Sequence, residues 1–162
     1  MSQRSRSVSW EDPLALADAA RTLSGADYLQ KLIRGELPPP PIAVLLNFRL
    51  NEIAEGRAVF VCDPAEYHYN PIGLVHGGLA ATLLDSAMGC AVHSTLPAGV
   101  AYTTLEIKVN YLRPLLPARG RVTCEGTLIH RGSRTATAAG RLTDVVGRLY
   151  AHATTTCLLM EG

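Results

Sequence analysis

The sequence predicts an α+β domain in which an antiparallel sheet wraps around one long central helix. Residues 76–96 are rich in Ala and Leu and are apolar on nearly every side, which is typical of a helix that is buried all round. Residues 103–159 instead hold strand-like segments separated by turn-forming residues. A single long helix followed by consecutive strands favours a sheet that packs on that helix.

The N-terminal part of the chain predicts helices that are separate from this core. Asp12 and Pro13 fit the N-cap and the first position of a helix, and helical spacing of apolar residues follows, with an interruption at Gly25. We therefore expect two short helices. The predicted organisation is a flexible tail at 1–11, an N-terminal helical segment at 12–37 and one domain at 38–162.

The strands are predicted from apolar alternation and from turn residues. Prolines 38–41 indicate an extended connector, which leads into strands at 44–53 and 57–62. In the first strand after the central helix, Leu105 and Ile107 alternate with Thr104 and Glu106, so one face of that strand is expected to be apolar. The four later strands are predicted at 103–113, 119–131, 135–144 and 149–159.

Composition excludes several classes of function. The 162 residues have a net charge of +1 and a pI near 7.7, whereas nucleic-acid-binding domains usually have a pI above ~9. Apolar stretches that are free of charge stay shorter than the ~18 residues that a membrane helix needs, and the N-terminus lacks the apolar core of a secretory signal. We expect a cytoplasmic protein that binds neither nucleic acid nor membranes.

The four cysteines predict no metal site. They lie far apart, without the closely spaced pairs that zinc sites use, and we interpret them as small apolar core residues. The cysteines are Cys62, Cys90, Cys124 and Cys157.

Charge is unevenly distributed along the chain. Residues 101–162 carry eight basic and four acidic side chains, while residues 1–100 carry seven basic and ten acidic ones. A basic C-terminal part in a nearly neutral protein indicates an anionic partner. The alternative is a solvated strand face that carries arginines.

The start of the central helix is a candidate site for an anionic oxygen. The first N–H groups of a helix have no intrahelical partner, and the helix dipole adds positive potential there. Gly77 and Gly78 follow His76 at this end and lack Cβ, so a ligand can approach the backbone. An ordinary helix cap is the alternative explanation of these three residues.

Asp85 is the second candidate. It lies in the most apolar helix of the chain, where a carboxylate is rarely buried without a partner. We interpret it as a general base or a nucleophile, and the alternative is an Asp paired for structural reasons.

Gly77 and Asp85 are too far apart to act on one substrate within one chain. Eight residues separate them, which is ~12 Å along a helix. If both act, Asp85 must come from a second copy, so we predict a homodimer with two equivalent sites at its interface. Small and polar residues that could let a partner approach are Gly78, Ala81, Thr82, Asp85 and Gly89.

The pattern Asn-x-x-Gly-x-x-His-Gly-Gly-x₆-Asp, from residue 70 to residue 85, and the later Tyr-Leu-Arg-Pro at 111–114 resemble a known family. The family that these motifs resemble is the hotdog-fold acyl-CoA thioesterases, in the phenylacetyl-CoA thioesterase (PaaI-like) branch. The resemblance covers about residues 40–160. It implies a hotdog fold for the domain at 38–162, with the N-terminal helical segment as an addition.

The resemblance also implies catalytic roles. Gly77 would donate its N–H to the thioester oxygen, and Asn70 would lie near that oxygen or near the attacking water. His76 would hold the loop and the helix start in place. Asp85 of the partner subunit would activate the water or attack the thioester carbon, and Thr104 would orient the water.

The implied substrate is an acyl-CoA thioester, with coenzyme A as part of the substrate and no other cofactor. Because Arg pairs well with phosphate, the basic C-terminal part supplies candidate phosphate ligands. The candidate substrate-binding residues are Gly78, Arg113, Arg131, Ser133 and Arg134. The resemblance implies that dimers of this kind pair into tetramers.

The predicted function is the hydrolysis of acyl-CoA to free acid and coenzyme A. One N–H donor at a helix end and one carboxylate suffice for this reaction without a metal. A non-catalytic acyl-CoA-binding hotdog module is one alternative, but Asp85 disfavours it. A hotdog dehydratase or hydratase is another, and its pattern of a His with an acid does not match. The acyl group is not predicted.

Overall fold

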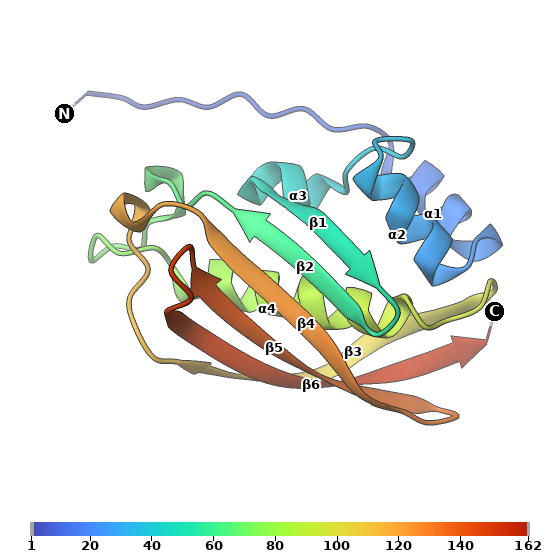
Figure 1. Cartoon of the computed structure of the whole chain (residues 1–162). Coiled ribbons are helices and arrows are strands. Elements are labelled where there is room, and N and C mark those ends of the chain that lie inside the picture. Colours follow the sequence, from blue (N-terminus) through green and yellow to red (C-terminus); the bar gives the residue numbers. More distant parts are fainter. Residues whose placement is uncertain (1, 162) are drawn as a thin grey trace.

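The computed structural model describes residues 2–161. Six strands form one antiparallel sheet in the order β1-β2-β4-β5-β6-β3, and the sheet curves around the long helix α4 (Figure 1). The predicted α+β architecture is therefore confirmed. The strands are β1 (Phe48–Ala54), β2 (Arg57–Cys62), β3 (Val100–Tyr111), β4 (Val122–Arg131), β5 (Thr135–Asp144) and β6 (Leu149–Glu161), and the helices are α1 (Pro13–Thr22), α2 (Gly25–Ile33), α3 (Pro41–Leu46) and α4 (Gly77–His93).

The core lies between α4 and the sheet. Leu83, Leu84, Ala87 and Met88 of α4 are fully buried, and they face small residues of β4, β5 and β6. Burial of a large aliphatic side chain contributes about 1.5–3 kcal/mol to the free energy of unfolding, so these packed side chains hold α4 on the sheet.

Each of the two N-terminal helices begins at a side-chain cap, of which the one at Asp12 was predicted. The Asp12 carboxylate accepts the N–H of Leu14 at 2.9 Å at the start of α1. The Ser24 hydroxyl accepts the N–H of Asp27 at 3.2 Å at the start of α2, so the interruption expected at Gly25 is the first residue of the second helix. Helix α2 packs against the C-terminal end of α4, and α1 packs against α2 and β3 at the same end of the molecule (Figure 1).

The predicted strand at 44–53 is wrong in its first part. Pro41–Leu46 form the short helix α3, Asn47 ends it in the left-handed conformation with φ 54°, and β1 starts at Phe48. Proline is favoured at the first position of a helix, and a short apolar run cannot be assigned to a strand or a helix by periodicity. The extended connector accordingly ends at Pro40.

Two other strands differ in detail from the expectation. Pro117–Arg119 form a single turn of 3₁₀-helix, so β4 starts at Val122 instead of residue 119. In β3, a β-bulge between Thr104 and Glu106 interrupts the predicted alternation. As a result Leu105 is 56% exposed, while Thr104 is half-buried.

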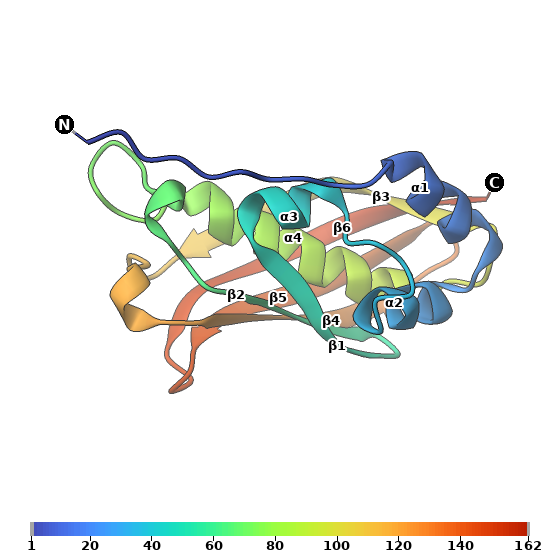
Figure 2. The same cartoon turned by 90° about the horizontal axis from the view of Figure 1, so that it is seen from above.

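The N-terminal residues cross the molecule as an extended strap, without helix or strand in residues 2–11 (Figure 2). The Arg6 guanidinium donates to the carbonyls of Leu45 and Val44 at 2.9 and 3.0 Å. Arg4 forms an ion pair with Glu66 at 3.0 Å. These exposed contacts place the tail along α3 and the loop that precedes α4.

Candidate active site

The first turn of α4 presents a free backbone donor at Gly77. His76 is the N-cap residue, and its Nδ1 accepts the N–H of Gly78 at 2.8 Å. The N–H of Leu79 donates to the His76 carbonyl at 3.0 Å. Within residues 2–161 the structure shows no acceptor for the N–H of Gly77. Gly77, rather than Gly78, therefore offers an N–H to an oxygen that gains negative charge.

Asn70 organises the loop that leads into this helix. Its Oδ1 accepts the N–H of Ile72 at 3.1 Å and the N–H of Leu74 at 3.0 Å, and Tyr69 and Val75 form an isolated antiparallel bridge. All hydrogen bonds of the Asn70 side chain within the described chain use Oδ1. Its amide NH₂ is thus available to a ligand.

Asp85 lies half-buried in the middle of α4, and the structure brings Thr104 to it. The Thr104 hydroxyl donates to Asp85 Oδ1 at 2.9 Å. The bulge after Thr104 helps to place this side chain, because it changes which residues of β3 face the helix. The two residues form a carboxylate–hydroxyl pair at the side of α4.

The expectation that the central helix is buried all round is wrong for the single chain. Five residues on one side of α4 are only half-buried, namely Gly78, Ala81, Thr82, Asp85 and Ser86. Gly89, which was expected on this side, is instead buried against Tyr102 of β3. The chain therefore leaves an open stripe along the first two-thirds of the helix.

Gly77 and Asp85 both belong to α4, so their separation stays at the ~12 Å set by eight residues of helix. That distance excludes simultaneous contact with one carbonyl group. The structure therefore contains two half-sites, which are the donor at the helix start and the Asp85–Thr104 pair.

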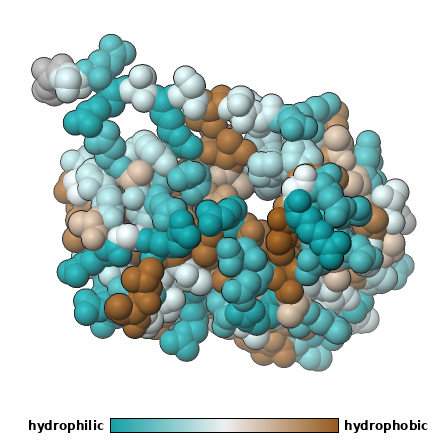
Figure 3. All heavy atoms as spheres, turned by 45° about the horizontal axis from the view of Figure 1, so that its top comes forward, coloured by the Kyte–Doolittle hydropathy of each residue, from teal (hydrophilic) through white to brown (hydrophobic). Residues whose placement is uncertain are grey.

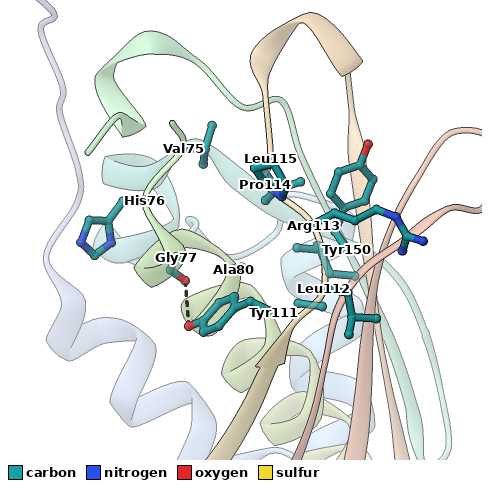
Figure 4. Close-up of a pocket in the computed structure, with 12 residues that line it drawn as sticks. Val75, His76, Gly77, Ala80, Tyr111, Leu112, Arg113, Pro114, Leu115 and Tyr150 are labelled. Atoms are coloured by element: carbon teal, nitrogen blue, oxygen red, sulfur yellow. Dashed lines mark hydrogen bonds between the residues drawn. The ribbon is translucent and has the colours of Figure 1, made fainter. Parts of the chain in front are cut away.

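A cavity of about 320 Å³ adjoins the first half-site (Figure 4). The Tyr111 hydroxyl donates to the Gly77 carbonyl at 3.2 Å, and its ring lies beside the glycine. Arg113 lines the same cavity, and its guanidinium donates to the carbonyl of Leu149. The residues that line this cavity thus include a cationic side chain, at Arg113, and the glycine whose N–H is free, at Gly77.

The other predicted phosphate ligands lie elsewhere. Arg131, Ser133 and Arg134 occupy the turn between β4 and β5, far from the N-terminus of α4 (Figure 1). The Arg131 guanidinium donates to the carbonyl of Thr95 at 2.7 Å, just beyond the C-terminal end of the helix. Within one chain these three residues do not join Gly77.

A larger cavity of about 580 Å³ adjoins Asp85. Its lining residues include Asp85, Cys90 and Thr104, together with mostly apolar residues of α2, α3 and β1 and with Arg49 of β1. In the space-filling view, hydrophobic side chains reach the surface beside a hollow on the face that the N-terminal tail crosses (Figure 3). The carboxylate therefore borders a cavity whose lining is mostly apolar.

The sequence did not single out Tyr111, Tyr102 or His93, although each lines one of these cavities. An isolated aromatic residue in a strand has the same pattern whether it packs in the core or borders a cavity. For Tyr111 a signal was present, because it opens the Tyr-Leu-Arg-Pro motif.

All four cysteines are free. Burial raises the pKa of Cys62 to about 11 and that of Cys90 to about 12, so these thiols stay protonated and are poor nucleophiles near neutral pH. Across residues 2–161, no group of three or more potential His, Cys, Asp or Glu ligands lies close enough to hold a metal ion. No helix in this part of the chain is long and apolar enough to cross a membrane.

Comparison with protein families gives one match. Residues 72–151 match the model described as the thioesterase superfamily. This range contains α4, β3 to β5 and every predicted site residue except Asn70.

Individual relatives agree with this match. A protein of Halobacterium salinarum with a provisional esterase name is 48% identical over 63 residues, which are 38% of this chain and 40% of that protein. Human acyl-coenzyme A thioesterase 13 is 32% identical over 71 residues, which are 44% of this chain and 50% of the enzyme. The aligned regions thus span half or less of these two relatives.

The fold also matches nearly the whole length of a solved structure. The phenylacetic acid degradation-related protein of Ralstonia eutropha superposes with a TM-score of 0.73 and 29% sequence identity. The match covers 81% of this chain and 98% of that protein.

Proposed function

This chain belongs to the thioesterase superfamily and has its hotdog fold, and from that premise we propose that it hydrolyses acyl-CoA thioesters to free acid and coenzyme A. One observation carries the proposal. Helix α4 presents both a free N–H, at Gly77, and a half-buried carboxylate, at Asp85, on a side that the chain leaves uncovered.

The helix start polarises the thioester carbonyl. The carbonyl oxygen accepts the N–H of Gly77, where the helix dipole also favours negative charge. The free amide NH₂ of Asn70 is a second donor from the adjacent loop. His76 supports this arrangement indirectly, because its cap on Gly78 fixes the first turn. These donors stabilise the oxyanion that forms as the carbonyl carbon is attacked.

The carboxylate supplies the attack on the carbon. Asp85 of the partner subunit either takes a proton from a water molecule, which then attacks, or attacks the carbon itself to give an anhydride that water hydrolyses. In both routes a C–O bond forms, the C–S bond breaks and coenzyme A leaves as a thiolate that takes up a proton. Thr104 positions the carboxylate through its 2.9 Å hydrogen bond.

A second copy of the chain is needed to complete each site. The open stripe of α4 holds small residues that allow close approach of another helix, and the adjacent strand β3 ends the sheet with an unpaired edge of 12 residues. A long unpaired edge strand is a template for pairing with another chain. We propose a two-fold dimer across this region, and a pair of such dimers as the tetramer.

Coenzyme A brings phosphate groups that arginines can bind. Arg113 shares the cavity beside Gly77 and is the candidate nearest to the donor. Arg131, Ser133 and Arg134 could serve the site only across a subunit interface, because one chain holds them at the opposite end of α4.

The proposal is tested by release of free thiol from a panel of acyl-CoAs. Asp85→Asn removes the charge and keeps the shape, so we expect kcat to fall by about 10²–10⁴-fold. Asp18→Asn is the matched control, since Asp18 is exposed and forms a surface ion pair with Arg21. Full activity of Asp85→Asn would refute the mechanism. Binding of acyl-CoA without thiol release by the wild type would identify a binding module instead.

A further inference from the structure

Two adjacent cavities, which share lining residues, lie beside the C-terminal half of α4. The first, of about 580 Å³, contains Asp85 at one side. The second, of about 620 Å³, is lined by Ala17, Ala20 and Arg21 of α1 and by the start of β3. Both volumes lie within the range of about 300–1,000 Å³ that is usual for small-molecule pockets.

Ala20, His93 and Tyr102 line both cavities, and we infer that the two large rings, of His93 and Tyr102, form the partition between them. Their rings pack with centroids 5.4 Å apart, and Tyr28 of α2 packs on the other side of His93 at 5.5 Å. Three rings from α2, α4 and β3 thus meet at one place. The two shared rings therefore lie where the two sets of lining residues meet.

Gly89 allows this partition to form. A Cβ at Gly89 would lie 2.7 Å from the hydroxyl oxygen of Tyr102, which is too close for any real contact. The missing side chain therefore lets the tyrosine lie against the helix. Burial also lowers the pKa of His93 and raises that of Tyr102, so both rings are uncharged near neutral pH and suit an apolar wall.

We propose that the cavity beside Asp85 receives the acyl group and that the partition of His93 and Tyr102 sets the longest acyl chain that the enzyme accepts. The inference rests on the proposed function. The thioester carbon must lie at Asp85, and the charged coenzyme A must stay near solvent, so the apolar chamber is left for the acyl group. A short or aromatic acyl group ends at the rings, and a longer chain collides with them.

The N-terminal helical segment has a role in this arrangement. Residues of α2 line the first cavity and residues of α1 line the second, so each cavity would lose part of its wall without residues 13–33. The substrate preference is therefore expected to depend on elements outside residues 72–151, the region that matches the superfamily.

The test measures kcat/KM for butanoyl-, octanoyl-, phenylacetyl-, dodecanoyl- and hexadecanoyl-CoA. We expect the wild type to lose activity sharply between octanoyl and hexadecanoyl. Tyr102→Ala should raise the hexadecanoyl-to-octanoyl ratio at least about tenfold, because pocket fit changes discrimination by that order. His93→Ala removes the other half of the partition and should act in the same direction. Tyr102→Phe keeps the ring and should retain the wild-type limit.

Several outcomes would overturn the inference. It is wrong if the wild type hydrolyses all chain lengths equally, or if a folded Tyr102→Ala or His93→Ala variant keeps the wild-type ratio. Binding of S-alkyl-CoA thioethers, which cannot be hydrolysed, separates the two proposals. If no acyl-CoA is turned over but the thioethers show the same length limit, the proposed activity fails and the partition stands.

Discussion

Thr104 reaches Asp85 through a local irregularity of β3. Regular alternation would give Leu105 the same face as Ile107, but the bulge between Thr104 and Glu106 turns Leu105 outward. The Thr104 hydroxyl then donates to the carboxylate at 2.9 Å. Because β-bulges often re-aim a side chain beside an active site, this one is best explained by the pair that it creates.

Thr104→Val tests the importance of this hydrogen bond. The substitution keeps the β-branched shape and removes only the donor, so Asp85 loses a partner that holds it in one orientation. A hydrogen bond to a charged group contributes about 1.5–3 kcal/mol, and we expect kcat to fall by about 10- to 100-fold with a smaller change in KM. Thr104→Ser keeps the donor and should recover most of the rate. A wild-type kcat in the Val variant would show that the contact is structural.

Residues with a motif could be predicted from the sequence, and residues that act by packing could not. Gly77 and Asp85 stood out because a glycine pair at a helix start and a carboxylate in an apolar helix both break local rules. His93 and Tyr102 break no rule, and only the packing of three elements makes them a partition. The resemblance had already implied Gly77 as the donor, and the hydrogen bond from the Gly78 N–H to His76 supplies the physical reason.

Among the elements, the N-terminal helices were predictable and their docking was not. Caps at Asp12 and Ser24 fix where α1 and α2 begin, and these are local signals. The site of docking depends on Gly25, whose N–H donates to the carbonyl of Leu96 at 2.9 Å beyond the end of α4. α3 was missed because Pro41, its first residue, was assigned to the extended connector, and the short apolar run that follows does not distinguish a helix from a strand by periodicity.

Gly25→Ala is expected to weaken this docking. A Cβ at this position would lie 1.8 Å from the carbonyl oxygen of His93, a backbone atom that cannot move without disturbing α4. Overpacking of this kind costs about 1–3 kcal/mol, which lowers Tm by roughly 2–12 °C in a protein of this size. The measurement is a thermal melt followed by circular dichroism.

Gly132→Ala provides the comparison for that experiment. Its added Cβ would come no closer than 3.2 Å to the carbonyl of Thr135, in the turn between β4 and β5. A small change in Tm is expected for this variant. Equal losses of stability in the two variants would show that the close approach of α2 to α4 is not what requires glycine at position 25.

At the scale of the whole molecule, stability is expected to fall in mild acid. Buried His68 accepts the N–H of Ala65 at Nδ1 and donates from Nε2 to the carbonyl of Leu46, both at 3.0 Å. Burial lowers its pKa below the usual value. The unfolded chain therefore binds a proton at His68 more readily than the folded chain does. The contribution of neutral His68 to the free energy of unfolding is fully present above pH ~6.5 and is lost as the pH falls toward the folded-state pKa.

His68→Gln tests that dependence. At pH 8 the variant loses the paired ring and should melt about 2–8 °C below the wild type. As the pH falls through ~6.5 toward 5, only the wild type loses the His68 contribution, so the difference in Tm should narrow. His93, whose pKa burial also lowers, titrates in both proteins and cancels. A difference that is constant or grows with acid would contradict this assignment.

The proposed active site is complete only when two chains assemble, because each chain supplies one half of it. If Gly77 of one subunit acts with Asp85 of the other, two inactive variants should complement each other. Gly77→Pro removes the N–H at the first helical position, where proline is tolerated, and His76 before it already has φ −61° and ψ 134°. Gly77→Ala is the matched control, because it adds a Cβ against the Tyr111 ring at 3.3 Å but keeps the N–H.

Co-expression of the Asp85→Asn and Gly77→Pro chains with different affinity tags would isolate the mixed dimer. One of its sites carries both substitutions and the other carries neither, so thiol release should return to about half of the wild-type rate per dimer. Each homodimer should stay inactive. If both residues served a site within one chain, both sites of the mixed dimer would be damaged and no activity would return. The ~12 Å between Gly77 and Asp85 along α4 predicts the first result.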